Sequence, residues 1–134
     1  MPKLKSYQGL GAVITGASSG IGRELALRIA ARGASLALVA RRSERLDELA
    51  AEIEAVGGRA LALPCDVSDR RAVEAAAAYA HERLGRVHLL VNNAGYGGHR
   101  AFVDWDLDDI EGIMRTNYLG SLYWTKALLP SMLK

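Results

Sequence analysis

The chain has 134 residues, of which 50% are hydrophobic and 24% are charged, and its formal net charge at pH 7 is +2. This length and composition predict one soluble domain with a hydrophobic core, because the chain is too apolar to remain disordered. Lysines and arginines are spread among acidic residues instead of forming one basic stripe, which argues against a nucleic-acid partner.

The first predicted elements are a strand at 11–17, GAVITGA, and a helix at 22–33, GRELALRIAARG. The strand is a short run with β-branched residues, and the helix has apolar residues at helical spacing and stops at Gly33. Between them lies the glycine-rich segment TGASSGIG, residues 15–22. In such a loop, backbone N–H groups can face an anion, and the following helix N-terminus adds about half a positive charge. This segment therefore predicts a phosphate-binding loop, with an ordinary tight turn as the alternative.

The strand–helix unit then repeats along the chain. A strand at 35–40 precedes an amphipathic helix at 43–58, and a strand at 59–67 precedes an alanine-rich helix at 69–84. The residues expected to cap these two helices are Ser43 and Ser68.

A fourth strand is predicted at 87–95, followed by a loop to about Leu107 and a last helix from about Asp108 toward Lys134. Strands that alternate with helices of this length predict an α/β fold. In such a fold, right-handed crossovers produce a parallel sheet with helices on both faces.

The single cysteine, Cys65, has no second thiol in the chain with which to form a disulfide or a zinc or redox pair. We therefore expect a reducing, cytoplasmic setting, and Cys65 itself is interpreted as a small strand-end residue. The histidines share no metal-ligand spacing, so no metal site is expected. The beginning, MPKLKSYQGLGAVITGA, is a poor signal peptide because its apolar run is short and rich in glycine. No segment approaches the roughly 18 apolar residues of a membrane span.

Two loops resemble the signatures of the classical short-chain dehydrogenase/reductase family. Thr15-Gly16-xxx-Gly20-Ile-Gly22 is similar to the cofactor loop of that family, and Asn92-Asn93-Ala94-Gly95 is similar to its second signature, at the end of the fourth strand. The resemblance covers essentially the whole chain. It implies a Rossmann-type, doubly wound parallel sheet of strand order 3-2-1-4. It also implies that residues 1–134 form a dinucleotide-binding domain in which the C-terminal part of the usual fold is absent.

The same resemblance implies a set of functional residues. The residues expected to bind the cofactor in the glycine loop and after the third and fourth strands are Gly16, Ser18, Ser19, Gly20, Ile21, Gly22, Asp66, Val67, Asn93, Ala94 and Gly95. Asn117, in RTNYLGS, resembles the asparagine of the family's catalytic helix. The residues alone leave other roles open: Asp66 as a turn residue, Asn93 as a strand terminator, and Asn117 as a partner of a backbone group.

The end of the second predicted strand bears on cofactor choice. NAD sites offer an acidic residue to the ribose 2′-hydroxyl, whereas NADP sites need a cation near the 2′-phosphate. Ala40 takes the acidic position, and Arg41 and Arg42 follow it. Because the arginine fork donates two parallel hydrogen bonds, we expect NADP(H) to be preferred over NAD(H). The alternative is a solvated pair of charges at a helix start.

By this resemblance the chain is the cofactor-binding half of an NADP(H)-dependent oxidoreductase that transfers a hydride between nicotinamide and a small carbonyl or alcohol substrate. Enzymes of the family use a Ser and a Tyr-xxx-Lys group for proton transfer. No tyrosine here has a lysine four positions later, so we expect the chain alone to be inactive. A non-catalytic dinucleotide-binding protein and a structural half that needs another chain remain as alternatives.

The implied strand order leaves the fourth strand at an open edge of the sheet. Unpaired backbone groups there and an apolar face on the last helix predict self-association into a homo-oligomer. The residues expected on these two surfaces are Leu89, Leu90, Val91, Ile113, Met114, Leu122, Leu128 and Leu129.

Overall fold

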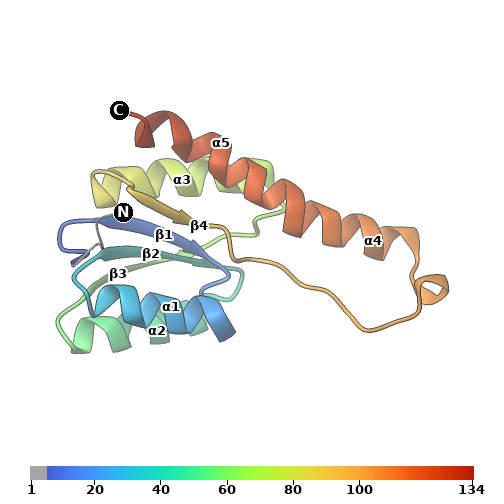
Figure 1. Ribbon diagram of the computed structural model, residues 1–134, viewed down its shortest axis with the longest axis horizontal. Coiled ribbons are helices and arrows are strands. Elements are labelled where there is room, and N and C mark those ends of the chain that lie inside the picture. The colour runs from blue at the N-terminus through green and yellow to red at the C-terminus, as the bar shows by residue number, and fades with distance from the viewer. Residues whose placement is uncertain (1–5) are drawn as a thin grey trace.

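Four parallel strands form one sheet in the order β3-β2-β1-β4, which confirms the expected Rossmann-type arrangement (Figure 1). The computed structural model describes residues 6–134, so the first five residues of the stretch compared with a signal peptide lie outside it. The strands are β1 Gly11–Thr15, β2 Ser35–Ala40, β3 Arg59–Pro64 and β4 Leu89–Val91.

Helices cover both faces of this sheet, with α1 and α2 on one face and α3 and α5 on the other (Figure 1). The α-helices are α1 Gly20–Ala30, α2 Ser43–Ala55, α3 Arg70–Leu84, α4 Leu107–Met114 and α5 Gly120–Met132. A π-helical turn, Arg115–Leu119, joins α4 to α5, and a short 3₁₀ turn, Phe102–Asp104, lies in the loop before α4.

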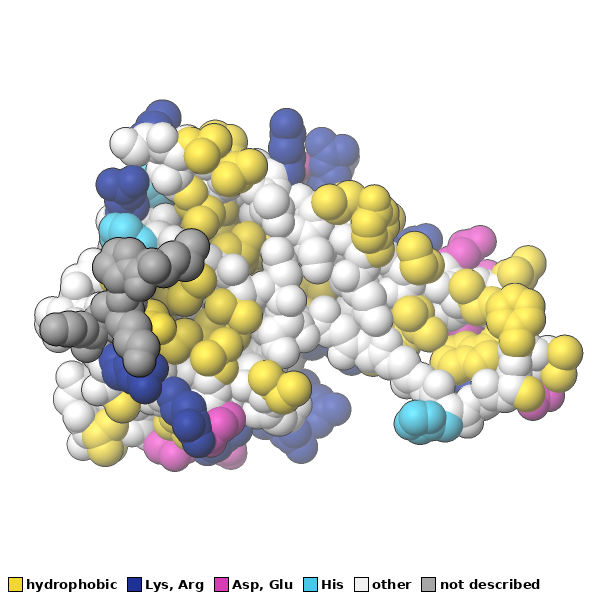
Figure 2. Space-filling view, viewed as in Figure 1, with side chains coloured by type: hydrophobic (Ala, Val, Ile, Leu, Met, Phe, Trp, Pro, Cys, Tyr) yellow, Lys and Arg dark blue, Asp and Glu magenta, His cyan; other side chains and the backbone are white. Residues whose placement is uncertain are grey.

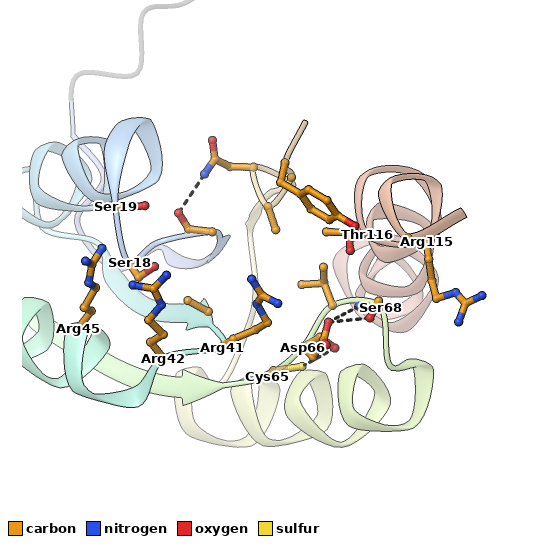
Figure 3. Close-up of a pocket in the computed structure, with 18 of the residues that line it drawn as sticks. Ser18, Ser19, Arg41, Arg42, Arg45, Cys65, Asp66, Ser68, Arg115 and Thr116 are labelled. Carbon is orange, nitrogen blue, oxygen red and sulfur yellow. Dashed lines mark hydrogen bonds between the residues drawn. The ribbon is translucent and has the colours of Figure 1, made fainter. Parts of the chain in front are cut away.

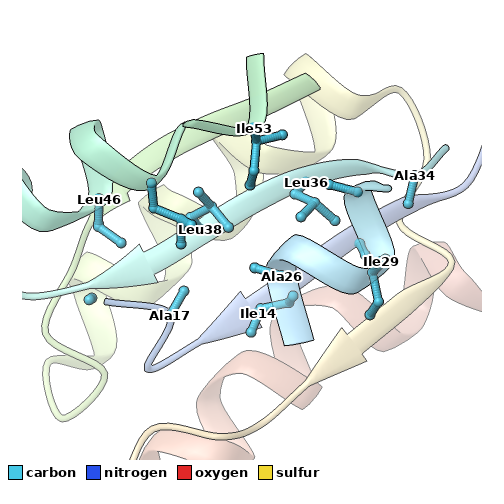
Figure 4. Packing of buried hydrophobic residues seen from close by; sticks show 13 residues of the cluster. Ile14, Ala17, Ala26, Ile29, Ala34, Leu36, Leu38, Leu46 and Ile53 are labelled. Atoms are coloured by element: carbon cyan, nitrogen blue, oxygen red, sulfur yellow. The ribbon is translucent and has the colours of Figure 1, made fainter. Parts of the chain in front are cut away.

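The alternation of side chains along the central strands builds two cores. In β2, Leu36 and Leu38 face the α1/α2 layer, whereas Ala37 and Val39 face the α3/α5 layer. Both faces are covered, and this explains why the strand is apolar at every position after Ser35. Figure 4 shows the first core, in which Leu36 and Leu38 pack with side chains of α1 and α2.

Neither expected serine cap forms. Ser43 is the first helical residue of α2, and Arg42 occupies the N-cap position without a side-chain cap bond. At α3 the N-cap is Asp69, whose carboxylate accepts a hydrogen bond from the Ala72 N–H at 3.1 Å. A carboxylate both accepts this bond and interacts favourably with the positive helix end, so the aspartate one residue later takes the place assigned to Ser68.

The fourth strand is shorter than expected, because the chain leaves the ladder after Val91. The N–H groups of Asn93 and Ala94 donate to the Thr15 hydroxyl instead of to a neighbouring strand. At the other end of β4, the His88 ring Nδ1 accepts a hydrogen bond from the Gly11 N–H at 3.0 Å. A side chain thus continues the contact between β1 and the segment before β4.

Within the described residues, β4 pairs only with β1, so its outer side is an open edge as expected. The last helix differs from the expectation at Leu128, which is buried among side chains of the α3/α5 layer. Of the other residues expected on this helix, Met114, Leu122 and Leu129 are exposed, and Ile113 is half-buried. Figure 2 shows hydrophobic side chains on the surface over α4 and the loop before it. None of the helices in residues 6–134 is both long enough and apolar enough to cross a membrane.

Register brings several strand ends together at one edge of the sheet. Ile14 lies opposite Leu38 on one side and opposite Val91 on the other, and Thr15 lies opposite Val39. The carboxyl ends of β1, β2 and β4 therefore meet where the strand order reverses, which is the place where α/β sheets bind ligands.

Candidate functional site

A cavity of about 900 Å³ opens at this edge of the sheet (Figure 3). Its walls come from the segments that follow the four strands and from α4 with the π-helical turn after it. The contributing residues lie within 16–21, 40–45, 65–68, 93–96 and 108–116. Segments far apart in the sequence thus share one site.

The glycine loop forms the wall next to β1. Gly16 has φ +64° and Gly20 has φ +56°, a backbone conformation in which L side chains are strained. Gly22 is needed for a different reason, because it packs directly against the glycine loop and Asn93. A Cβ there would overlap the Gly16 carbonyl oxygen and come within 2.5 Å of the Asn93 amide nitrogen. Of the expected cofactor residues of this loop, Gly16, Ser18, Ser19 and Ile21 line the cavity, whereas Gly20 and Gly22 do not.

Two side chains lock this loop to the end of β4. The Asn93 amide Nδ2 donates to the backbone carbonyls of Thr15 and Gly16, both at 3.1 Å. The Thr15 hydroxyl accepts from the N–H groups of Asn93 and Ala94 at 3.0 Å each and donates to the Val91 carbonyl at 3.4 Å. Thr15 is the one buried polar side chain among the described residues, and these bonds account for its burial. The Asn93 side chain therefore holds the backbone of the glycine loop, a role that goes beyond ending the strand.

Asn92 and Asn117 make further hydrogen bonds near the end of β4. The Asn92 amide donates to the Thr125 hydroxyl of α5 at 3.1 Å. Asn117 lies in the π-helical turn, where its Oδ1 accepts from the Tyr96 N–H at 3.0 Å and its Nδ2 donates to the Tyr96 carbonyl at 2.8 Å. The Asn117 side chain thus holds the segment after Gly95 in place, and it does not line the cavity itself.

The wall of the cavity that follows β3 contains Asp66 and Val67. The Asp66 carboxylate is exposed, and its Oδ1 accepts from the backbone N–H and the hydroxyl of Ser68 at 3.0 and 2.8 Å. This is the turn that the sequence offered as the alternative for Asp66, and it orients the carboxylate at the rim of the cavity. Val67 is buried and packs closely against the backbone of Gly120.

Cys65 ends β3 at this wall and is 6% exposed. Burial, and after it the negative charges of Asp66 and Asp69, raise the pKa of the Cys65 thiol from 9.0 to about 11. The thiol is therefore neutral at physiological pH, which supports its interpretation as a strand-end residue and not as a nucleophile.

We expect the folded chain to protect Cys65 from alkylation by iodoacetamide. The attacking species is the thiolate, and a pKa raised from 9.0 to about 11 lowers its fraction at pH 8 by roughly a hundredfold. Because the folded-state pKa is the higher one, the stabilisation from a neutral thiol is complete below pH 9 and is lost as the pH rises through about 11. Alkylation rates by mass spectrometry, measured against pH in buffer and in urea, test this. An apparent pKa of 9 or lower in the folded chain would contradict it.

The fourth group of residues is cationic. Arg41 and Arg42 line the cavity with exposed side chains, next to the nearly buried Ala40. Arg45, in the first turn of α2, lines the same cavity. None of the three arginines forms an ion pair with another residue of the part of the chain that the structure describes.

The sequence missed several residues of the cavity wall. Arg45 carried no clear signal, because Arg41 precedes α2 and the helical spacing of four therefore does not relate the two residues. The others come from the loop before α4, from α4 and from the turn after it, and only the tertiary fold brings them to the strand ends. They are Tyr96, Asp108, Glu111, Gly112, Arg115 and Thr116. Residues 6–134 contain no group of three or more His, Cys, Asp or Glu side chains arranged to hold a metal ion.

Known proteins similar to this chain agree with the family resemblance of its two signature loops. A family model described as short chain dehydrogenase matches residues 11–134. The chain is 43% identical over 133 residues to a fatty acyl-CoA reductase of Acinetobacter baylyi, covering 97% of this chain and 45% of that protein. It is 35% identical over 123 residues to the 7alpha-hydroxysteroid dehydrogenase of Escherichia coli, covering 92% of this chain and 48% of that protein. The chain thus spans about half the length of the curated relatives that it matches.

Solved structures agree with these relatives. A 7alpha-hydroxysteroid dehydrogenase complexed with NADH and 7-oxo glycochenodeoxycholic acid superposes with a TM-score of 0.91 at 34% identity, over 95% of this chain and 49% of that one. A short chain dehydrogenase from Burkholderia cenocepacia in complex with NADP superposes with a TM-score of 0.90 at 36% identity, over 96% of this chain and 53% of that one. The similar structures therefore include proteins with either nicotinamide dinucleotide.

Proposed function

This chain belongs to the short-chain dehydrogenase family, and on that premise we propose that it binds NADP(H) as the cofactor-binding half of an oxidoreductase. The reaction is hydride transfer between nicotinamide and a small carbonyl or alcohol substrate. The observation that carries the cofactor assignment is the row of arginines without ion-pair partners among the described residues, which follows Ala40 at the mouth of the cavity.

The shape and charge of the site fit a dinucleotide. At the N-terminus of α1, the glycine loop leaves the first N–H groups of the helix without helical partners, which suits a pyrophosphate. A Cβ at Gly16 would meet Asn93 and Ala94 within 3.0 Å, so the loop can lie this close to β4 only with glycine there. The resemblance assigns Asp66 and Val67 to the adenine, and both residues line the cavity after β3.

When bound, a nicotinamide dinucleotide supplies the hydride chemistry. The residues of this chain bind and position it: Thr15 and Asn93 hold the glycine loop against β4, and Asn117 holds the backbone of Tyr96 beside Gly95. A catalytic role for Asn117 stays a prediction that rests on resemblance. In this structure, Asn117 acts through the backbone that it holds.

Replacing Arg41 by alanine is expected to weaken NADPH binding by about 1 to 3 kcal/mol and to leave NADH binding nearly unchanged. The reason is that only NADPH carries the 2′-phosphate that a guanidinium would pair with. Ala40→Asp is expected to shift the preference toward NADH, because a carboxylate accepts from the 2′-hydroxyl and repels the 2′-phosphate. Titration calorimetry of both variants with both cofactors measures this, and equal losses for the two cofactors in Arg41→Ala would refute the assignment.

Other parts of the proposal rest on the sequence. Because these 134 residues hold no Tyr-xxx-Lys group, we predict no turnover by this chain alone. Non-catalytic dinucleotide binding is the alternative function. The open edge of β4 predicts self-association. A reducing, cytoplasmic setting and the lack of a nucleic-acid partner also stay predictions, based on the lone Cys65 and on the mixed charge pattern.

A further inference from the structure

The beginning of α2 carries an arrangement of charge that opposes its own stability. Arg42 is the N-cap residue and Arg45 lies in the first turn, where the helix end is itself positive. Arg42 and Arg45 are three positions apart, so two like charges lie close together at this helix start. Glu44 is the only acidic residue of that first turn. Conflicts of this kind between local rules are typical of functional positions.

The acidic residues around Arg45 do not neutralise it. Glu48 follows Arg45 by three positions, a helical spacing that permits an ion pair, and within residues 6–134 no such pair forms. Glu52, one turn further along α2, pairs with Arg23 of α1 instead. Elsewhere in the described chain, Arg28 and Arg70 do pair with glutamates four positions away. Arg45 is therefore left facing the cavity without a carboxylate partner.

The side chain of Arg45 is placed to act on the same ligand as its neighbours. In Figure 3, Arg45 and Arg42 extend from α2 toward the loop that carries Ser18 and Ser19, and Arg41 stands closer to Asp66. Ser19 is the N-cap residue of α1 and makes no side-chain cap bond, so its hydroxyl is free to donate to a ligand. The cavity wall at this point thus combines guanidinium and hydroxyl donors.

We propose that Arg45 is a specificity-determining residue that joins Arg41 and Arg42 in binding the phosphate monoester on the ribose of the cofactor. This inference rests on the proposed NADP(H) function and adds a residue to it. A phosphate monoester carries about −1.5 to −2 charges near neutral pH and three acceptor oxygens, which one guanidinium does not satisfy. A further fork, from the first turn of α2, supplies the remaining charge and donors, and the bound phosphate in turn removes the repulsion among the arginines.

The test compares Arg45→Gln with Arg71→Gln in the full chain. Arg71 is a matched control, because it is an exposed arginine in the first turn of α3 and does not line the cavity. Titration calorimetry uses two pairs of probes, NADPH with NADH and adenosine 2′,5′-bisphosphate with 5′-AMP. For Arg45→Gln we expect the Kd of both 2′-phosphorylated probes to rise roughly tenfold, while the Kd of NADH and 5′-AMP changes less than about twofold. Arg71→Gln is expected to change none of them.

The melting temperature of the ligand-free variants provides a second readout. Because Arg45 lies at a positive helix end, Arg45→Gln is expected to leave that temperature unchanged or to raise it. A clear fall would assign Arg45 a structural role and overturn the inference, as would equal losses or no losses for the two members of each probe pair. Tighter binding of NADH than of NADPH by the unaltered chain would instead overturn the proposed cofactor preference, so the two failures are distinguishable.

Discussion

Replacing Gly22 by alanine is expected to abolish dinucleotide binding and to destabilise the folded chain by about 3 kcal/mol or more. Gly22 is buried in the first turn of α1, and a methyl group there would overlap the Gly16 carbonyl oxygen and reach within 2.5 Å of the Asn93 amide nitrogen. Both neighbours belong to the lock between the glycine loop and β4, so neither can move without breaking hydrogen bonds. Urea unfolding and NADPH titration measure the two effects.

The matched control for stability is Gly112→Ala in α4. An added methyl group at Gly112 would meet only the hydroxyl oxygen of Tyr96 at 2.7 Å, and an exposed tyrosine can swing away from it. Alanine favours helix over glycine by about 1 kcal/mol, so Gly112→Ala is expected to be neutral or stabilising. If Gly22→Ala changed the free energy of unfolding no more than Gly112→Ala, the close packing of α1 against the glycine loop would not contribute to stability.

The exchange of Asn93 for aspartate is expected to destabilise the chain by roughly 3 kcal/mol or more and to prevent cofactor binding. The Asn93 Nδ2 donates to the carbonyls of both Thr15 and Gly16, and aspartate has the same size but no donor. Its partly buried negative charge would face two carbonyl oxygens. The glycine loop would then separate from the end of β4, and the anion site would lose its shape.

Asn92→Asp is the control for this substitution, because it makes the same chemical change one residue earlier. The Asn92 side chain is exposed, and its partner is the Thr125 hydroxyl. This hydroxyl donates to the Ser121 carbonyl at 2.7 Å and can rotate to donate to a carboxylate in its place. We therefore expect Asn92→Asp to cost less than about 1 kcal/mol. Chemical denaturation of both variants gives the comparison, and similar losses for the two would show that the bonds from Asn93 to Thr15 and Gly16 do not hold the loop.

Much of the fold could be predicted because the spacing of apolar residues along the chain indicates whether a segment is a helix or a strand. The apolar run of β2 and the helical spacing in α1 and α2 follow from burial on both faces of a sheet and on one face of a helix. The ends of elements were less predictable. Asp69 caps α3 in place of Ser68 because the choice depends on which side chain reaches the free N–H groups. Leu128 faces the core for a similar reason, since the packing of α5 against α3 decides which of its apolar sides is covered.

The sequence by itself identified three candidate binding segments, because their chemistry depends on residue type and local spacing. They are the glycine loop, the arginines after Ala40 and the asparagines after β4. Only the tertiary structure decided that Thr15 and Asn93 share a set of hydrogen bonds across 78 positions. It also decided that the side chain of Asn117 holds the backbone of Tyr96, and that Arg45 reaches the cavity. The physical reason is that local propensities act within a few residues, whereas a site at the strand ends depends on strand order and register, which the burial of the whole sheet sets.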